Sequence, residues 1–182
     1  MSGWKLHPEF NTYFITSSIT EWSKIFVDET YFSVIANNLS YCKEHKDLIL
    51  HAYVIMLDHI HLIATTSKSY QMAEIMRDFK SYTSKEIRKQ LLKEKREGIL
   101  STFSQAAEIE NRGNEFKIWQ DGYHPIAIKS RNFFREKLNY IHQNPVKKGF
   151  VLRPEYWNYS SARAYQEHDE SKSLIEIEIL NC

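Results

Sequence analysis

The fold is decided by the stretch Leu48-Ile-Leu-His-Ala-Tyr-Val-Ile-Met-Leu-Asp-His-Ile-His-Leu-Ile-Ala-Thr-Thr66. Its first part, 48–56, is an apolar run of the length expected for a buried strand. Its last part, 59–66, is rich in β-branched residues and predicts a second strand. Only Leu57 and Asp58 separate the two runs, so the sequence predicts an antiparallel hairpin.

The second strand of this hairpin carries two histidines at alternate positions. Side chains two residues apart in a strand point to the same face, with about 7 Å between their Cα atoms. His59 and His61 can therefore share one metal ion. Ile60, Leu62 and Ala64 point to the opposite face, which is apolar and should pack on helices. Taken alone the pair is weak evidence, since histidines also occur on half-exposed strands without a ligand.

The residues on either side of the hairpin predict further strands and helices. Tyr13–Thr20 has the composition of a strand, and a helix should follow from Asp28, its N-cap, to His45. After the hairpin, an amphipathic helix is predicted over 70–97 and should end at Gly98. The residues after it are polar and lack helical periodicity, which predicts a loop or insertion over 98–118.

The last predicted helix brings two polar side chains together. It follows a short strand predicted within 119–130 and runs from Asn132 to Asn144, because Pro145 disfavours helical geometry at the residue before it. Tyr140 and Asn144 are four residues apart and lie on one helix face. By local pattern alone, the better interpretation is an ordinary half-buried aromatic and a helix-terminal amide.

This order of elements predicts an α+β protein with a ferredoxin-like antiparallel sheet that carries helices on one face. The length fits one domain, which we assign to residues 1–166, followed by an acidic C-terminal tail over 167–182. Within that tail, 173–180 is interpreted as either an edge strand or a partner-binding segment.

Charge and composition limit the functions to consider. Between Lys129 and Arg153 lie seven basic residues and a single acidic one, Glu136, although the net charge is only +1. The rest of the chain then nets 1 − 6 = −5. One basic face in an otherwise mildly acidic protein suggests an anionic partner, and nucleic acid is the obvious candidate. The two cysteines form no disulfide framework or zinc spacing. No signal peptide or membrane-spanning run is apparent, so a cytoplasmic protein is expected.

Four blocks of sequence, in this order, resemble the HUH single-tyrosine transposases and in particular their REP-associated branch. They are Met56-Leu-Asp-His-Ile-His-Leu62, Trp119-Gln-Asp-Gly-Tyr-His124, Tyr140-Ile-His-Gln-Asn-Pro-Val-Lys-Lys-Gly-Phe-Val151 and Trp157-Asn-Tyr-Ser-Ser161. The likeness extends from about Tyr13 to Tyr165. Relatives usually carry Pro-Asn before the first histidine, where this chain has Leu57-Asp58.

The resemblance implies a role for each polar residue singled out above. His59 and His61 would be the metal-binding histidines, Asn144 the third ligand and Tyr140 the nucleophile, on a helix at the metal face of the sheet. The implied ion is Mg²⁺ or Mn²⁺, although zinc is chemically compatible with the ligands.

The resemblance also implies a substrate, namely single-stranded DNA that contains a hairpin. Such DNA would be cut and rejoined through a 5′-phosphotyrosine. Basic residues around Tyr140 would bind its phosphates, although each is equally interpreted as part of a solvated charged face: Lys129, Arg131, Arg135, Lys147, Lys148 and Arg153. Relatives act as monomers or as dimers that exchange the tyrosine helix, so a homodimer and a partner-supplied Tyr140 are both left open.

Two other functions compete with this one. A catalytically inactive or domesticated relative would bind DNA hairpins without cutting them. A metal-dependent hydrolase would use His59 and His61 with Asp58 as the third ligand. Adjacent strand residues point to opposite faces, so Asp58 suits that role only if the turn reorients it.

Overall fold

The computed structural model describes residues 11–66, 72–111, 113–122 and 125–180. The elements in chain order are β1 (Asn11–Ser18), η1 (Thr20–Trp22), α1 (Glu29–His45), β2 (Leu48–Ile55), β3 (His59–Thr66), α2 (Met72–Lys93), α3 (Glu97–Glu110), β4 (Ile126–Ala127), α4 (Arg131–Lys147), η2 (Pro154–Tyr156), α5 (Ala162–Glu167) and η3 (Glu170–Lys172). Tyr70, the predicted start of a helix, and Tyr123 and His124 lie outside the described residues.

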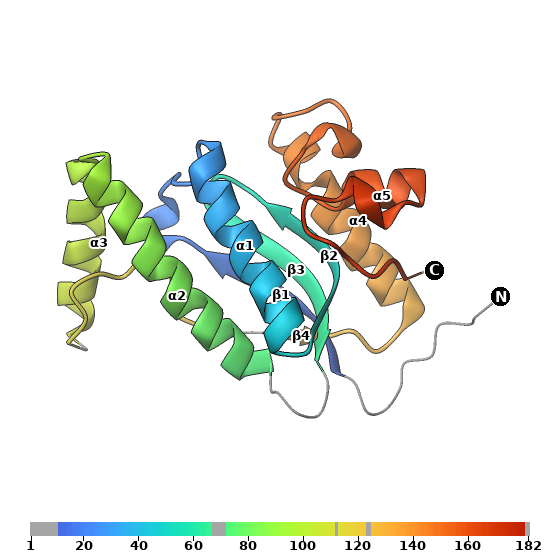
Figure 1. Cartoon of the computed structure of the whole chain (residues 1–182), viewed down its shortest axis with the longest axis horizontal. Coiled ribbons are helices and arrows are strands. Elements are labelled where there is room, and N and C mark those ends of the chain that lie inside the picture. The colour runs from blue at the N-terminus through green and yellow to red at the C-terminus, as the bar shows by residue number, and fades with distance from the viewer. Residues whose placement is uncertain (1–10, 67–71, 112, 123–124, 181–182) are drawn as a thin grey trace.

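The strands form one sheet in the order β2-β3-β1-β4, and every neighbouring pair is antiparallel. The predicted hairpin is β2–β3, closed by the Met56 N–H, which donates to the His59 carbonyl at 2.8 Å. The predicted α+β, ferredoxin-like sheet is confirmed (Figure 1).

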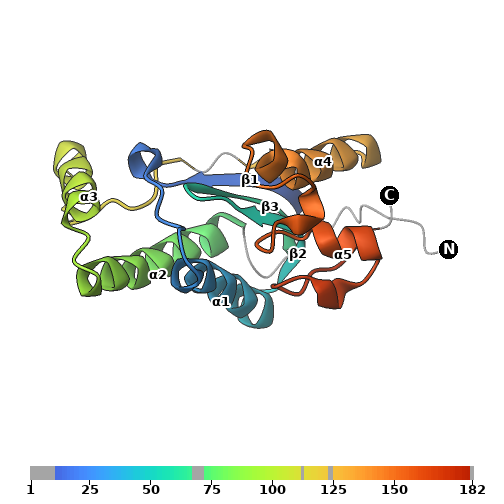
Figure 2. The ribbon, with the colours of Figure 1, turned by 90° about the horizontal axis from the view of Figure 1, so that it is seen from above.

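Helices cover both faces of the sheet, and each face has its own apolar cluster. Seen from above, α1 and α2 lie on one side of the strands and α4 lies on the other (Figure 2). Ile60, Leu62 and Ala64 are buried against α1 and α2, as predicted. Phe134 and Ile141 of α4 join a second cluster on the opposite face. The face of β3 that carries the histidines is therefore the face that α4 covers.

A β-bulge at His51 changes which residues of β2 face each cluster. The register with β3 shifts between Leu50 and Ala52. A bulge inserts one extra residue and reverses the alternation of faces beyond it. As a result Leu50 and Tyr53, three residues apart, both pack toward α1 and α2, while Val54 faces α4.

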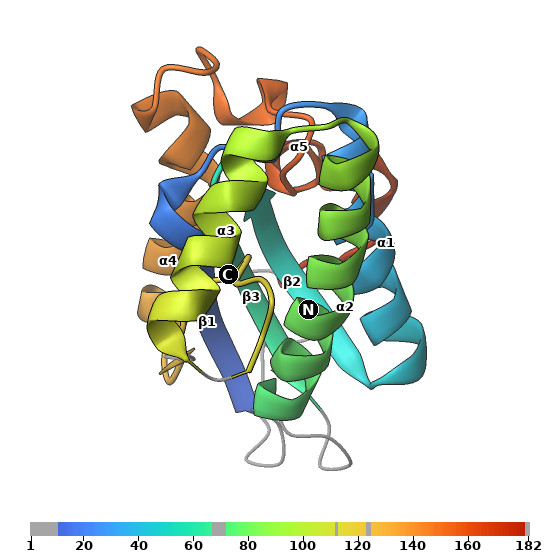
Figure 3. The same ribbon diagram turned by 90° about the vertical axis from the view of Figure 1, so that its left-hand side faces the viewer.

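The helix α3 occupies the segment predicted as a loop, so that prediction is wrong. Phe103 and Ala107 lie four residues apart and are buried, and α3 packs beside α2 (Figure 3). Gly98 does not end the preceding helix, because that helix ends before Lys95, whose φ of 54° is left-handed. A Cβ at Gly98 would meet nothing within 4 Å. Polar residues are interleaved with the short apolar stripe of α3, and the stripe was not recognised in the sequence.

The helix α4 also differs from its prediction, since it continues through Pro145 to Lys147. Proline removes one donor, but the Lys148 N–H still reaches the Asn144 carbonyl at 3.1 Å and the Phe150 N–H reaches the Pro145 carbonyl at 2.9 Å. Asn144 and Pro145 are both buried. Packing and these capping bonds thus override the local preference of the residue before a proline.

The acidic tail does not stand apart from the predicted domain. It buries Ile175 and Ile177 in the cluster under α1 and α2, and the Glu178 N–H donates to the Leu50 carbonyl of the edge strand β2 at 2.8 Å. No regular strand forms over 173–180, the segment interpreted as either an edge strand or a partner-binding segment. Among the helices in the described part of the chain, none has the length and apolar character needed to cross a membrane.

Candidate active site

The two histidines of β3 lie side by side on the sheet face covered by α4. Their ring centroids are 4.8 Å apart, with an angle of 72° between the ring planes. Only 7% of His59 and 4% of His61 is exposed. Both residues were expected on one face, away from the main core, and the structure confirms this placement.

Each imidazole has its Nδ1 atom held by a neighbouring side chain. Asp58 Oδ1 accepts from His59 Nδ1 at 2.5 Å. His61 Nδ1 lies 2.8 Å from Oγ1 of Thr16, which is its cross-strand partner in β1. With Nδ1 engaged in this way, Nε2 is the nitrogen left to bind a ligand.

The Nε2 atom of His61 has no hydrogen-bond partner among the described residues, although it is buried. Burial, reinforced by the nearby His59, lowers the pKa of His61 to about 3. The ring is therefore neutral near pH 7, the state in which imidazole binds metal ions. An unpaired buried nitrogen is costly unless a ligand satisfies it, so the histidine pair fits a metal ion.

Tyr140 lies directly against this pair, within the same chain. Its ring centroid is 5.2 Å from that of His61 and 5.8 Å from that of Phe14, and 40% of the residue is exposed. Phe14 also stacks on His61 at 5.4 Å. A partly exposed phenol thus stands beside the candidate ligands.

Asn144 lies one helical turn after Tyr140 and is buried, with 7% exposed. Among the described residues no third His, Cys, Asp or Glu completes a group of three with the histidine pair. His142 points away from the histidine pair, since its Nε2 lies 2.9 Å from Ser161 Oγ. Burial lowers the pKa of His142 to about 3. His142 is structural.

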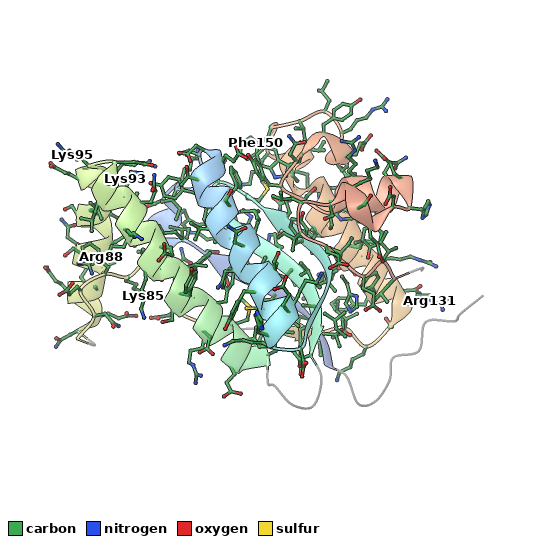
Figure 4. The ribbon with its side chains drawn as sticks, viewed as in Figure 1. Lys85, Arg88, Lys93, Lys95, Arg131 and Phe150 are labelled. Carbon is green, nitrogen blue, oxygen red and sulfur yellow. The ribbon has the colours of Figure 1, made fainter. Side chains whose placement is uncertain are left out.

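The six basic residues expected around Tyr140 are all exposed but are not all close to it. Lys147 Nζ lies 5.6 Å from the centre of the Tyr140 ring. Arg131 begins α4, about 14 Å along the helix axis from Tyr140, and Figure 4 shows it at the end of α4 opposite to Phe150. These residues therefore follow the length of α4.

Some neighbours of the site were missed or misjudged from the sequence. Lys137 Nζ lies 5.9 Å from the centre of the Tyr140 ring. Lys137 is three residues before Tyr140 in a predicted helix, so its place beside Tyr140 could have been predicted from this spacing. Asp58 holds His59 and is not placed as a ligand at Nε2. No sequence pattern pointed to Thr16, because its pairing with His61 depends on the register of β1 against β3.

A second set of basic side chains lies on α2. Lys85, Lys89 and Lys93, at helical spacing, are exposed, and Figure 4 shows Lys85, Arg88 and Lys93 along this helix. Because α2 covers the face opposite to α4, these residues do not line the candidate site.

Comparison with known proteins agrees with this geometry. The family model described as "Transposase IS200 like" matches residues 13–144, a range that includes the hairpin, the histidine pair, Tyr140 and Asn144. The chain belongs to the IS200-like transposase family. The family expected from the sequence motifs is thereby confirmed.

Individual members of this transposase family show the same relationship. The REP-associated tyrosine transposase of Escherichia coli (strain K12) is 26% identical over 132 residues, which cover 72% of this chain and 65% of that protein. The chain thus spans less than two thirds of that relative. A relative from Haemophilus influenzae is 27% identical over 149 residues, covering 82% of this chain and 78% of its own length.

A solved structure, described as a REP-associated tyrosine transposase bound to a REP hairpin, shares the fold. Its TM-score is 0.58 at 22% identity, and the match covers 90% of this chain and 84% of that one. At this identity the likeness establishes the fold.

Proposed function

We propose that this transposase-family protein cuts and rejoins single-stranded DNA beside hairpins. Tyr140 would be the nucleophile, and His59, His61 and Asn144 would hold one Mg²⁺ or Mn²⁺ ion. The observation that carries the proposal is the unpartnered Nε2 of the buried His61, with the Tyr140 ring 5.2 Å from the same imidazole.

The ligand set determines which chemistry is available. Two imidazoles and one amide oxygen leave coordination positions open for phosphate oxygens. When bound, the ion would act as a Lewis acid on the scissile phosphate. Asp58 and Thr16 hold the two imidazoles through Nδ1, so the ligand nitrogens are oriented before any ion arrives.

Tyr140 supplies the covalent step. Its phenolic oxygen forms a bond to phosphorus, the bond from phosphorus to the 3′-oxygen breaks, the phenol loses its proton and the 3′-oxygen gains one. The product is a 5′-phosphotyrosine and a free 3′-hydroxyl. Attack by another 3′-hydroxyl reverses these steps and restores Tyr140, so strand joining requires no ATP.

Two lysines favour this step by their charge. Lys137 and Lys147 place ammonium groups 5.9 and 5.6 Å from the centre of the Tyr140 ring. Positive charge there attracts the phosphate backbone of the strand that Tyr140 would attack.

A hairpin substrate is supported by the solved relative, which is described as bound to a REP hairpin. In this chain the basic residues of α4 and of the segment after it, from Lys129 to Arg153, would follow the DNA backbone. These contacts are charge-dependent, so binding should weaken as salt concentration rises.

The test is a covalent adduct assay with matched tyrosine variants. Purified protein is mixed with Mn²⁺ or Mg²⁺ and with labelled single-stranded hairpins from the genomic flanks of its gene, then resolved on a denaturing gel. Wild-type protein and Tyr156→Phe, in which an exposed tyrosine outside α4 is changed, should give a shifted band. Tyr140→Phe and a chelator should each abolish it.

The opposite result is equally informative. Salt-sensitive hairpin binding with no adduct, at a metal concentration where binding of the ion is measured directly, would reject cleavage. The protein would then be a hairpin-binding relative that has lost its chemistry. An adduct that survives in Tyr140→Phe would reject the assigned nucleophile.

A further inference from the structure

Trp22 combines high exposure with a position beside a candidate metal ligand. It leaves 58% of its surface exposed, while its ring centroid lies 6.1 Å from that of His59, at an angle of 78°. Ile19, Ile25 and Phe26, on either side of it in the chain, are fully buried. The indole is thus held out at the site by a segment that is otherwise packed into the core.

The backbone that presents Trp22 is strained. Glu21 and Trp22 have φ values of 54° and 51°, and this left-handed region is sterically unfavourable for residues other than glycine. Strained residues of this kind concentrate at functional sites, where surrounding contacts hold them in place.

The contacts that hold this turn lead to the histidines. The Ile19 N–H donates to the Asp58 carbonyl at 2.8 Å, and the Ile25 N–H donates to the Leu57 carbonyl at 3.0 Å. Leu57 and Asp58 form the turn that leads directly into His59. Trp22 is therefore fixed to the same backbone unit as the candidate metal ligands, and its position relative to them does not depend on a distant loop.

We propose that an unpaired base next to the scissile phosphate stacks on the indole of Trp22. This inference rests on the proposed function. A phosphate bound at the histidine pair would bring its neighbouring bases to the indole, which flanks His59. Indole stacks on any base, and such contacts are worth about 1–3 kcal/mol each. The contact would orient the strand without reading its sequence.

Tyr41 is an exposed aromatic residue that does not share this environment. Tyr41, on α1, is 50% exposed but lies on the helical layer opposite to α4. Its ring centroid lies 4.5 Å from that of His45 of its own helix, at an angle of 47°. Exposure alone therefore does not distinguish Trp22, whereas its strained backbone and its contact with His59 do. Tyr41 serves as the matched control.

The experiment measures binding and leaves cleavage out. In a Tyr140→Phe background, affinity is measured for labelled hairpin oligonucleotides from the genomic flanks, each with one abasic site in the single-stranded flank. Trp22→Ala should weaken binding to the intact strand about 5- to 150-fold. One abasic position should produce the same loss, and combining it with Trp22→Ala should add nothing further. Tyr41→Ala should leave affinity unchanged.

Two further variants guard against a simple folding defect. Trp22→Phe keeps a stacking ring and should retain most of the affinity, whereas Trp22→Leu keeps apolar bulk without the ring and should behave as Trp22→Ala. Equal affinities for the Phe and Leu variants would overturn the proposal, as would losses that add independently at every abasic position. DNA-induced quenching of the tryptophan fluorescence should be smaller in Trp22→Phe than in the wild type, since one of the four indoles of the chain is then absent.

The outcomes for stacking and for cleavage can be separated. An adduct in the wild-type protein without coupling between Trp22 and any base would overturn the stacking proposal and leave the proposed function intact. Coupling without an adduct would support stacking and overturn cleavage.

Discussion

The carboxylate of Asp58 lies 2.5 Å from Nδ1 of His59, the residue that follows it in the chain. This contact makes Nδ1 the donor and directs Nε2 toward a ligand. Asp58→Ala should therefore lower the affinity for Mn²⁺ about 10- to 100-fold, measured by titration calorimetry without DNA. Glu44→Gln, which changes an exposed carboxylate of α1, is the control. Unchanged affinity in Asp58→Ala would show that His59 needs no orienting partner.

Thr16 gives the corresponding test for His61. Thr16→Ser keeps the hydroxyl that lies 2.8 Å from His61 Nδ1, and Thr16→Val removes it at similar volume. We expect Thr16→Val to bind Mn²⁺ about ten-fold more weakly and Thr16→Ser to resemble the wild type. Equal affinities for the two variants would assign the effect to packing.

Tyr140 contacts His61 of its own chain, and this predicts the result of a mixing experiment. Neither Tyr140→Phe nor His61→Ala should form a covalent DNA adduct alone, and their mixture should form none either. An exchange of α4 between two chains would instead combine one intact tyrosine with one intact metal site. Adduct formation in the mixture would therefore reject a site built within a single chain.

The salt dependence of DNA binding should distinguish the basic residues near Tyr140 from those of α2. The slope of log affinity against log salt should fall by about 0.7 for each phosphate of a single strand that the protein no longer neutralises. Lys147→Gln should show this change. Lys93→Gln, at an exposed position on the opposite helical layer, should leave the slope unaltered, and equal changes in both would indicate that DNA covers both faces.

His51 should make folding stability depend on pH. Burial lowers the pKa of His51 below its usual 6.5, partly opposed by its hydrogen bond to the Glu178 carbonyl. Below about pH 6.5 the unfolded chain therefore binds a proton that the folded chain does not. Stability should fall on acidification, by up to about 1.4 kcal/mol per pH unit for this group.

Denaturant unfolding measures this pH dependence between about pH 5 and 7, the range in which an ordinary histidine titrates. His61 and His142, whose pKa values are also lowered, act in the same direction, so the wild-type slope includes all three. His51→Gln should flatten the slope, while the exposed-site control His168→Gln should not. An unaltered slope in His51→Gln would mean that the other two histidines account for it.

Features set by neighbouring residues were predictable from sequence. The two-residue break at Leu57 and Asp58 identified the hairpin, and strand periodicity placed His59 and His61 on one face. Asp28 was correctly expected to cap α1, where its side chain accepts from the Thr30 N–H at 2.9 Å. Each of these depends on contacts within a few residues.

Features set by distant contacts were not predictable in this way. The helix α4 passes through Pro145, where Asn144 and Pro145 are buried. The partner of His61 depends on the register of β1 against β3, which places Thr16 opposite it. Tertiary packing decides each of these, and a single sequence does not display it.

The placement of Tyr140 over His61 in one chain has a stoichiometric consequence. With a single nucleophile, one molecule can hold one broken DNA end at a time under the proposed chemistry. Moving a segment that has two ends then requires either two molecules or two successive rounds, with Tyr140 released between them. The number of phenols at the site, and not the size of the sheet, would set how many strands are open at once.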